Sequence, residues 1–339
     1  MQDVHTSRLR TRIAITRCLV ALGAGVIAVA CSDPSTAPQP RVSEALGSPA
    51  GIAGGKIFLG GGPWGVDVSN NGLVYVTQLG SGQVAVSSIS AQTISAEIGV
   101  GTVPTGVVFA PNGRTAYVAN QFDGTLGVID VASGVQIATI PLPNGALPFA
   151  VAVSPDGNQI FIASNQTSVF VADAHTLAIV DAIPVDEAPN AFALSPNGKH
   201  FFVSSFAGAT VTEFSIASHA VVRTYSTGGA PQGLTTNKKG NELYVVNESG
   251  YVTLFSTATG AILRILTLAA GGFGAAVTAD DVHLYITEPD IGIVQIVNLQ
   301  NRKMQGAINV GGQPRRVAFN STGKVGVVAN QDGYITFIK

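Results

Sequence analysis

Short runs of apolar residues alternate along most of the chain with turns that are rich in Gly, Asn, Asp and Pro. The runs are too short for helices, so the pattern predicts β-strands joined by tight turns. Several runs, such as Ala116–Asn120 and Ile160–Ser164, are apolar at consecutive positions rather than at every second one. Strands of that kind are covered on both faces, so we expect sheets that pack against other sheets on each side.

One motif recurs from residue 63 onward: a proline, a variable residue, a small residue, three mostly apolar residues, and a turn that ends in Gly or Asp. Its seven copies start 41 to 44 residues apart, at Pro63, Pro104, Pro148, Pro189, Pro231, Gly272 and Pro314. A period of about 40–45 residues is that of one four-stranded propeller blade. The sequence therefore predicts an all-β fold, a seven-bladed β-propeller of four-stranded antiparallel blades over residues 56–339. Asn-Gly or Asp-Gly after the first strand of a copy predicts a two-residue hairpin.

The last copy is one strand short. It has a first strand at Val317–Phe319, a second at Val325–Asn330 and a third at Tyr334–Lys339, after which the chain stops. The segment Lys56–Gly60 precedes Pro63 as the fourth strands of other copies precede their own proline. We expect this N-terminal strand to complete the last blade, because a closed ring leaves no open blade edge.

The first 55 residues differ in character from the repeats. A basic stretch containing four Arg precedes the apolar run Cys18–Ala30, which is too short to span a membrane comfortably and is typical of a signal peptide. The sequence Ala28-Val29-Ala30-Cys31 resembles the bacterial lipoprotein signal, which implies cleavage after residue 30 and lipidation of Cys31. The alternative is ordinary secretory cleavage, which leaves a free thiol. Residues 31–55, rich in Ala, Ser, Gly and Pro, are predicted to be a flexible tether to the membrane.

Composition narrows the class of protein. Charged residues are 11% of the chain and the formal net charge is −2, which argues against a partner nucleic acid bound by neutralising its phosphates. The two cysteines are Cys18 and Cys31, so lipidation of Cys31 leaves the mature domain without a thiol, a disulfide or a cysteine metal ligand. We expect a monomer in the cell envelope, periplasmic or surface-exposed, with the outer membrane favoured in a cell that has two membranes.

Three segments carry a family resemblance. Tyr117-Val-Ala-Asn120, Val128-Ile-Asp130 and Ser154-Pro-Asp-Gly157 resemble the YVTN family of β-propeller repeats, and the resemblance covers residues 56–339. It implies a propeller fold in an exported or surface protein, and it implies no particular activity.

A candidate ligand site follows from the phase of the repeat. The loop that enters the first strand and the loop that follows the second strand leave a blade on the same face. They present the variable residue after each proline and the residue that closes each second strand. From these we select as candidate ligand-binding residues Trp64, Phe149, Phe273, Asn120, Asn247, Glu288 and Arg315. Aromatic groups beside amides suit a carbohydrate, a peptide, a protein loop or a small polar ligand. The alternative is that the Asn and Ser side chains only bond the loop backbone.

An enzyme is the second alternative. The chain has no nucleophile elbow, phosphate loop or zinc-binding His-Glu-x-x-His motif, and its four mature histidines are spread over three repeats. No cofactor is expected. However, Asp67 occupies a position that is Val, Ala or Thr in the other copies. Together with Asn120, Asn247 and Glu288 it suggests a divalent metal in the central channel, as in lactonase-type propellers, and hence a lactonase- or lyase-like enzyme.

Overall fold

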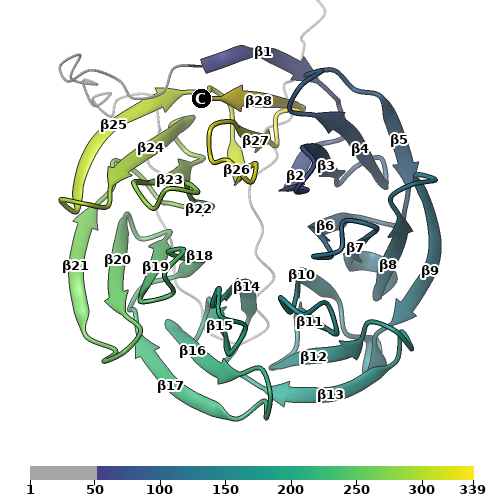
Figure 1. Ribbon diagram of the computed structural model, residues 1–339, viewed down its shortest axis with the longest axis horizontal. Coiled ribbons are helices and arrows are strands. Elements are labelled where there is room, and N and C mark those ends of the chain that lie inside the picture. The colour runs from purple at the N-terminus through teal and green to yellow at the C-terminus, as the bar shows by residue number, and fades with distance from the viewer. Residues whose placement is uncertain (1–51) are drawn as a thin grey trace, which may run out of the picture. The chain divides into compact units, whose positions relative to one another are not determined.

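Seven four-stranded antiparallel sheets form a ring around a central axis in the computed structural model, which describes residues 52–339 (Figure 1). The predicted seven-bladed propeller is therefore confirmed. Blades 1 to 3 contain β2 to β13 in order, with bounds Pro63–Val68, Leu73–Gln78, Gln83–Ser88, Ala96–Gly99, Pro104–Phe109, Thr115–Asn120, Thr125–Asp130, Val135–Pro141, Pro148–Val153, Gln159–Ser164, Ser168–Asp173 and Ile179–Pro184. Blades 4 to 6 contain β14 to β25, with bounds Pro189–Leu194, His200–Ser205, Thr210–Ser215, Val221–Ser226, Pro231–Thr236, Glu242–Asn247, Tyr251–Ser256, Ile262–Thr267, Ala275–Val277, His283–Glu288, Ile293–Asn298 and Lys303–Asn309.

Blade 7 joins the two ends of the described chain. It consists of β26 (Pro314–Phe319), β27 (Gly326–Asn330), β28 (Tyr334–Ile338) and, on its outer edge, β1 (Ile52–Phe58). The register pairs Ile57 with Ile335 and Phe58 with Tyr334, and Figure 1 shows β1 beside β28. The predicted closure by an N-terminal strand is confirmed, and that strand begins at Ile52 rather than at Lys56.

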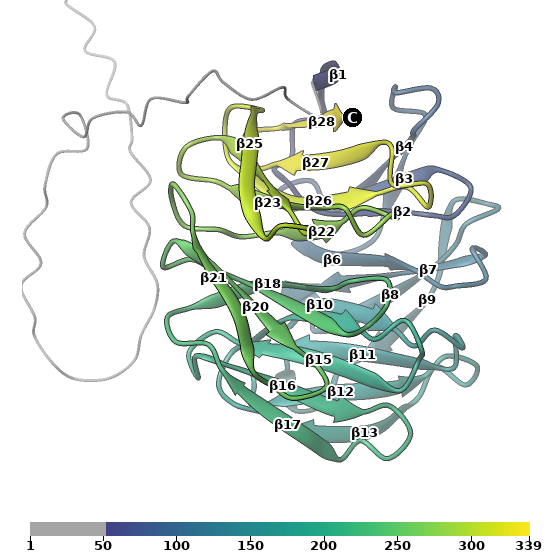
Figure 2. The same ribbon diagram turned by 60° about the vertical axis from the view of Figure 1, so that its left-hand side comes forward.

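Hydrophobic clusters hold the blades together. Each of the seven clusters lies between two neighbouring blades, and the one between blades 2 and 3 contains Tyr117, Leu126, Ile160 and Phe170. The second and third strands of a blade are apolar at consecutive positions because both of their faces are covered in this way. The ring is therefore stabilised mainly between sheets, and the turned view shows neighbouring sheets side by side (Figure 2).

The turns between first and second strands are longer than predicted. In blade 3 the Ser154 amide donates to the Gln159 carbonyl and the Gly157 amide to the Ser154 carbonyl, so the loop has four residues. Gly157 has a φ of +79°, whereas Asp156 is not in the left-handed region. The prediction of a two-residue hairpin is wrong because Asp156 instead accepts a 2.5 Å hydrogen bond from the Ser154 hydroxyl, a contact that favours a wider turn.

The only helices among residues 52–339 are the short 3-10 turns η2 (Gln121–Asp123) and η3 (Pro143–Gly145). No helix in that range has the length and apolar character needed to cross a membrane. The predicted signal peptide and most of the tether, with Cys31, lie outside the described residues.

Candidate functional site

The start of each first strand is fixed by the neighbouring blade. The Thr77 hydroxyl accepts from the Gly65 amide and donates to the Thr105 carbonyl at 2.7 Å. Thr287 likewise links Gly274 to the Arg315 carbonyl at 2.8 Å. A Cβ added to Gly274 would lie 2.5 Å from that carbonyl oxygen. This close approach explains why the motif has a small residue after its variable position, and it fixes the backbone of the variable residue.

Three aromatic variable residues from different blades contact one another. The Trp64 ring lies edge-on to Phe149, with centroids 6.1 Å apart, and to Phe273, with centroids 5.4 Å apart. These residues belong to blades 1, 3 and 6, so Trp64 contacts side chains on both sides of the axis. Phe273 is buried, whereas Trp64 and Phe149 are partly exposed. The structure therefore places these three candidate residues beside one another.

Two arginines from blade 7 complete this group. The Arg315 guanidinium lies over Trp64, 4.8 Å from the ring centroid, and 5.1 Å from the centroid of Phe273. It donates to Gln331 at 2.7 Å and to Gln313 at 3.1 Å. The Arg316 guanidinium lies 4.8 Å from the Phe273 centroid. We call Trp64, Phe149, Phe273, Arg315 and Arg316 the mouth cluster.

The variable residues of blades 4 and 5 are amides. Asn190 donates to Gln232, which in turn donates to Glu248 at 2.8 Å. Both amides are largely buried, as is Thr105 of blade 2. Six of the seven equivalent positions therefore divide into an aromatic and cationic group and a hydrogen-bonded amide pair, and Thr105 is the seventh.

The residues that close the second strands lie elsewhere. Asn247 is 1% exposed and its amide group bonds the Ala230 and Ser249 amides, the Gly228 carbonyl and the Tyr251 hydroxyl. Glu288 is fully buried and accepts from the Ala270 amide at 2.6 Å. Asn120 is also fully buried. The structure thus places these three candidates beneath the loops rather than beside Trp64, and two of them bond the loop backbone.

Two buried oxygen atoms of this group have no hydrogen-bond partner among the described residues, namely Glu288 Oε1 and Asn120 Oδ1. Burial raises the pKa of the Glu288 carboxyl to about 7, against the opposing effect of its backbone hydrogen bonds. A carboxyl group with such a pKa is partly protonated near neutral pH.

Asp67 has a structural partner in the next blade. Its carboxylate accepts from the Phe109 amide at 2.8 Å and from the Val68 amide at 2.9 Å. Burial nevertheless raises its pKa to about 6. Asp67, Asn247 and Glu288 each bond a different loop or strand, and residues 52–339 contain no group of three or more His, Cys, Asp and Glu that could hold a metal ion.

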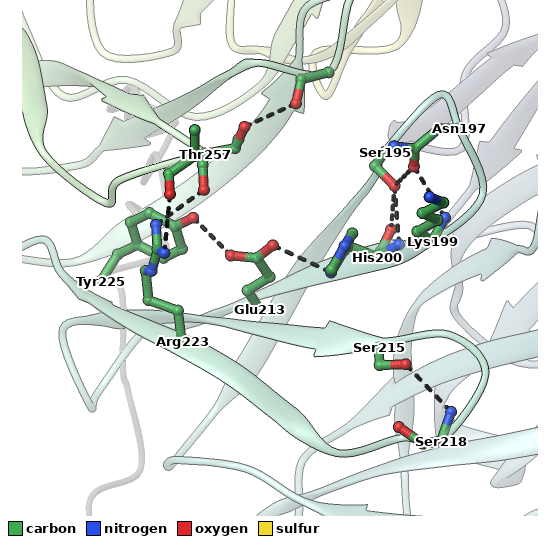
Figure 3. Close-up of polar contacts among 12 residues, drawn as sticks. Ser195, Asn197, Lys199, His200, Glu213, Ser215, Ser218, Arg223, Tyr225 and Thr257 are labelled. Atoms are coloured by element: carbon green, nitrogen blue, oxygen red, sulfur yellow. Dashed lines mark hydrogen bonds and ion pairs between the residues drawn. The ribbon is translucent and has the colours of Figure 1, made fainter.

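A second polar cluster lies in blade 4, away from the mouth cluster. Glu213 is 4% exposed in β16, at a position that is apolar in the other blades. Its carboxylate accepts from the Tyr225 hydroxyl at 2.7 Å and lies 3.2 Å from His200 Nδ1 (Figure 3). Burial and the Glu213 carboxylate raise the pKa of Tyr225. The Arg223 guanidinium lies over the Tyr225 ring and donates to the Thr257 and Ala258 carbonyls.

Sequence reasoning missed Arg316 and Glu213. Both depart from the residue class of the other copies: Arg316 stands where six copies have Gly or Ala, and Glu213 where the others have Val, Leu, Ile or Phe. The comparison between copies that singled out Asp67, applied to every position of the repeat, would have found both residues.

The fold and the mouth cluster define a β-propeller protein with an aromatic and cationic group formed by residues from four of its blades. Residues 69–241 match the model of the YNCE-like β-propeller family, and the chain belongs to that family. Among solved structures it is similar to hydrazine synthase of Kuenenia stuttgartiensis, with a TM-score of 0.76 and 19% sequence identity over 82% of this chain and 95% of that chain. At this identity the likeness shows the fold alone. A comparison with curated protein sequences gives no match.

Proposed function

We propose that this protein is a binding protein of the cell envelope whose mouth cluster holds a small molecule or a peptide with a planar apolar group. The contact of Trp64 with Phe149 and Phe273 across the channel carries this proposal. Three aromatic side chains from three separate blades are not needed to close a blade interface, because each interface has its own apolar cluster. Partly exposed aromatic side chains beside fixed polar groups are typical of ligand sites.

The neighbouring polar groups support selectivity. Asn190 and Gln232 in blades 4 and 5 are fixed by hydrogen bonds to each other and to Glu248. Arg315 is fixed by Gln313 and Gln331. Side chains that are already fixed in this way lose little conformational entropy when they bind a ligand.

Lipidation of Cys31 is part of the same proposal, and it rests on the Ala-Val-Ala-Cys sequence. Residues 32–51 would then link the membrane to β1, with an end-to-end distance of roughly 25 Å for a flexible chain of that length. A Cys31→Ala chain should fail to be lipidated, and it should be recovered as soluble protein or as uncleaved precursor. Recovery of the cleaved variant in the membrane fraction would refute the anchor.

The binding proposal can be tested with a simple planar probe. Trp64 is the one tryptophan of the chain, so its fluorescence reports directly on the mouth cluster. Titration with benzamide should give a saturable change in Trp64 emission, and Phe149→Ala should weaken the binding at least fivefold. Phe122→Ala is the matched control, because Phe122 is 64% exposed on η2 and should leave the titration unchanged. No saturable change in the unmodified protein, or an equal effect of the two variants, would refute the site.

A further inference from the structure

Arg316 differs in size and charge from the residues at the equivalent position of the other six blades. The residue after the variable position is Gly or Ala in those blades because the next blade approaches closely there; a Cβ on Gly233 would lie 2.5 Å from the Phe273 carbonyl oxygen. Only blade 7 has a long charged side chain at this point. Packing therefore does not require Arg316, and the backbone of the fold accepts a small residue in its place.

The surroundings of Arg316 do not neutralise its charge. Its guanidinium contacts the Phe273 ring, and within residues 52–339 it has neither a hydrogen bond to a side chain nor an ion pair. Burial and the positive charge of Arg315 lower the pKa of Arg316 to about 10, so the group still carries its proton at neutral pH. Arg316 is only partly exposed, and a cation that has lost part of its hydration without gaining an acceptor is unfavourable.

A planar anion would relieve this cost. A guanidinium group presents parallel N–H donors that match the two oxygen atoms of a carboxylate, and such bidentate pairs are among the strongest hydrogen bonds in proteins. The guanidinium of Arg316 has these donors unused, whereas those of Arg315 already bond Gln313 and Gln331. One unused guanidinium matches a single carboxylate better than a phosphate dianion, which requires more donors.

We propose that Arg316 forms an anion subsite in the mouth cluster and that the ligand of this protein has a carboxylate next to its planar apolar group. The Phe273 ring contacts both Trp64 and the Arg316 guanidinium, so the two groups of the ligand would be close together. This inference rests on the proposed function, and it adds the charge of the ligand.

The test compares benzoate with benzamide, two probes of similar shape that differ in charge. Trp64 emission should show that benzoate binds at least tenfold more tightly than benzamide to the unmodified protein. Arg316→Ala, which introduces the residue found at this position in blades 3 and 4, should remove that preference, so that benzoate binds no more tightly than benzamide. Arg264→Ala is the charge-matched control, because Arg264 is exposed on β21, and it should keep the preference.

The outcomes separate the two proposals. Equal binding of benzoate and benzamide would refute the anion subsite and leave the aromatic site in place, whereas failure of both probes would refute the proposed function. Phenyl phosphate is the third probe: tighter binding than benzoate would overturn the assignment to a carboxylate. Thermal unfolding of Arg316→Ala should match that of the unmodified protein, and a melting temperature lowered by more than a few degrees would show that Arg316 has a structural role instead.

Discussion

The indole of Trp64 and the ring of Phe273 meet nearly at right angles, with an interplanar angle of 85°, although they come from blades 1 and 6. Each comes directly after the first residue of its repeat motif, Pro63 or Gly272. Blade 7 lies between blades 6 and 1, and its Arg315 and Arg316 contact the same Phe273 ring. Phe273 is the buried member of the mouth cluster, whereas Trp64 is partly exposed.

This difference in burial predicts that stability and binding can be separated. Phe273→Ala should lower the free energy of unfolding by about 3 kcal/mol, because it removes a buried aromatic side chain. Trp64→Ala should cost about 1 kcal/mol, since its side chain is already partly exposed. Urea denaturation followed by circular dichroism measures both values. Equal losses would contradict the distinction between a supporting and a ligand-facing residue.

The buried carboxyl group of Glu288 predicts a dependence of stability on pH. Its pKa is about 7 in the folded protein, against an ordinary value of 4.5, so the folded state binds this proton more tightly than the unfolded state does. The free energy of unfolding should therefore fall as the pH rises from 4.5 to 7. Glu288→Gln should make this fall less steep, as measured by urea denaturation at several pH values.

The control for that measurement is Glu187→Gln, because Glu187 is exposed. It should leave the pH profile of stability unchanged. A profile of Glu288→Gln that overlays the unmodified one would show that Glu288 does not bind the proton more tightly on folding.

The cluster around Glu213 predicts strong coupling between two substitutions. Tyr225→Phe removes the hydroxyl that donates to the Glu213 carboxylate, and it should destabilise the protein by about 1–3 kcal/mol because a buried acceptor loses a partner. Glu213→Val, which introduces a residue found at this position in blades 1, 2 and 3, should make the loss of the Tyr225 hydroxyl nearly neutral. A double-mutant cycle in urea measures the coupling energy. Additive effects would contradict the hydrogen bond.

The closing strand predicts that the ring unfolds as a unit. Deletion of residues 52–59 removes β1 and the apolar contacts of Ile57 and Leu59 with the cluster between blades 7 and 1. The melting temperature of the whole domain should fall by roughly 5–10 °C in a single calorimetric transition, given several kcal/mol of lost burial. Phe58→Ala is the control, because it keeps the strand pairing and removes a side chain that is 73% exposed. A second, separate transition would contradict unfolding as a unit.

The phase of the repeat was sufficient to predict the blades, their order and the closing strand, because identical local patterns must form identical sheets. It also placed Trp64, Phe149, Phe273 and Arg315 together, since equivalent positions of a ring face one axis. It could not place Asn120, Asn247 and Glu288, because the pattern shows which strand end a residue occupies and not whether its side chain lies under a loop. The side-chain amide of Asn247 accepts hydrogen bonds from Ala230 and Ser249, which lie in two different loops. The distance between two loops in the folded protein cannot be read from the repeat pattern.

The pairing of β1 with β28 also determines when the ring can close during synthesis of the chain. Ile57 pairs with Ile335, so β1, the first strand of residues 52–339, can pair only after β28 has been synthesised. Contacts of such long sequence separation form slowly. During synthesis, the apolar edge that β28 later covers stays open while six complete blades are made. A chain that ends before residue 334 therefore lacks β28 and cannot close the ring. The edges of β1 and β27 then stay unpaired, and such edges favour aggregation or degradation of the unfinished chain.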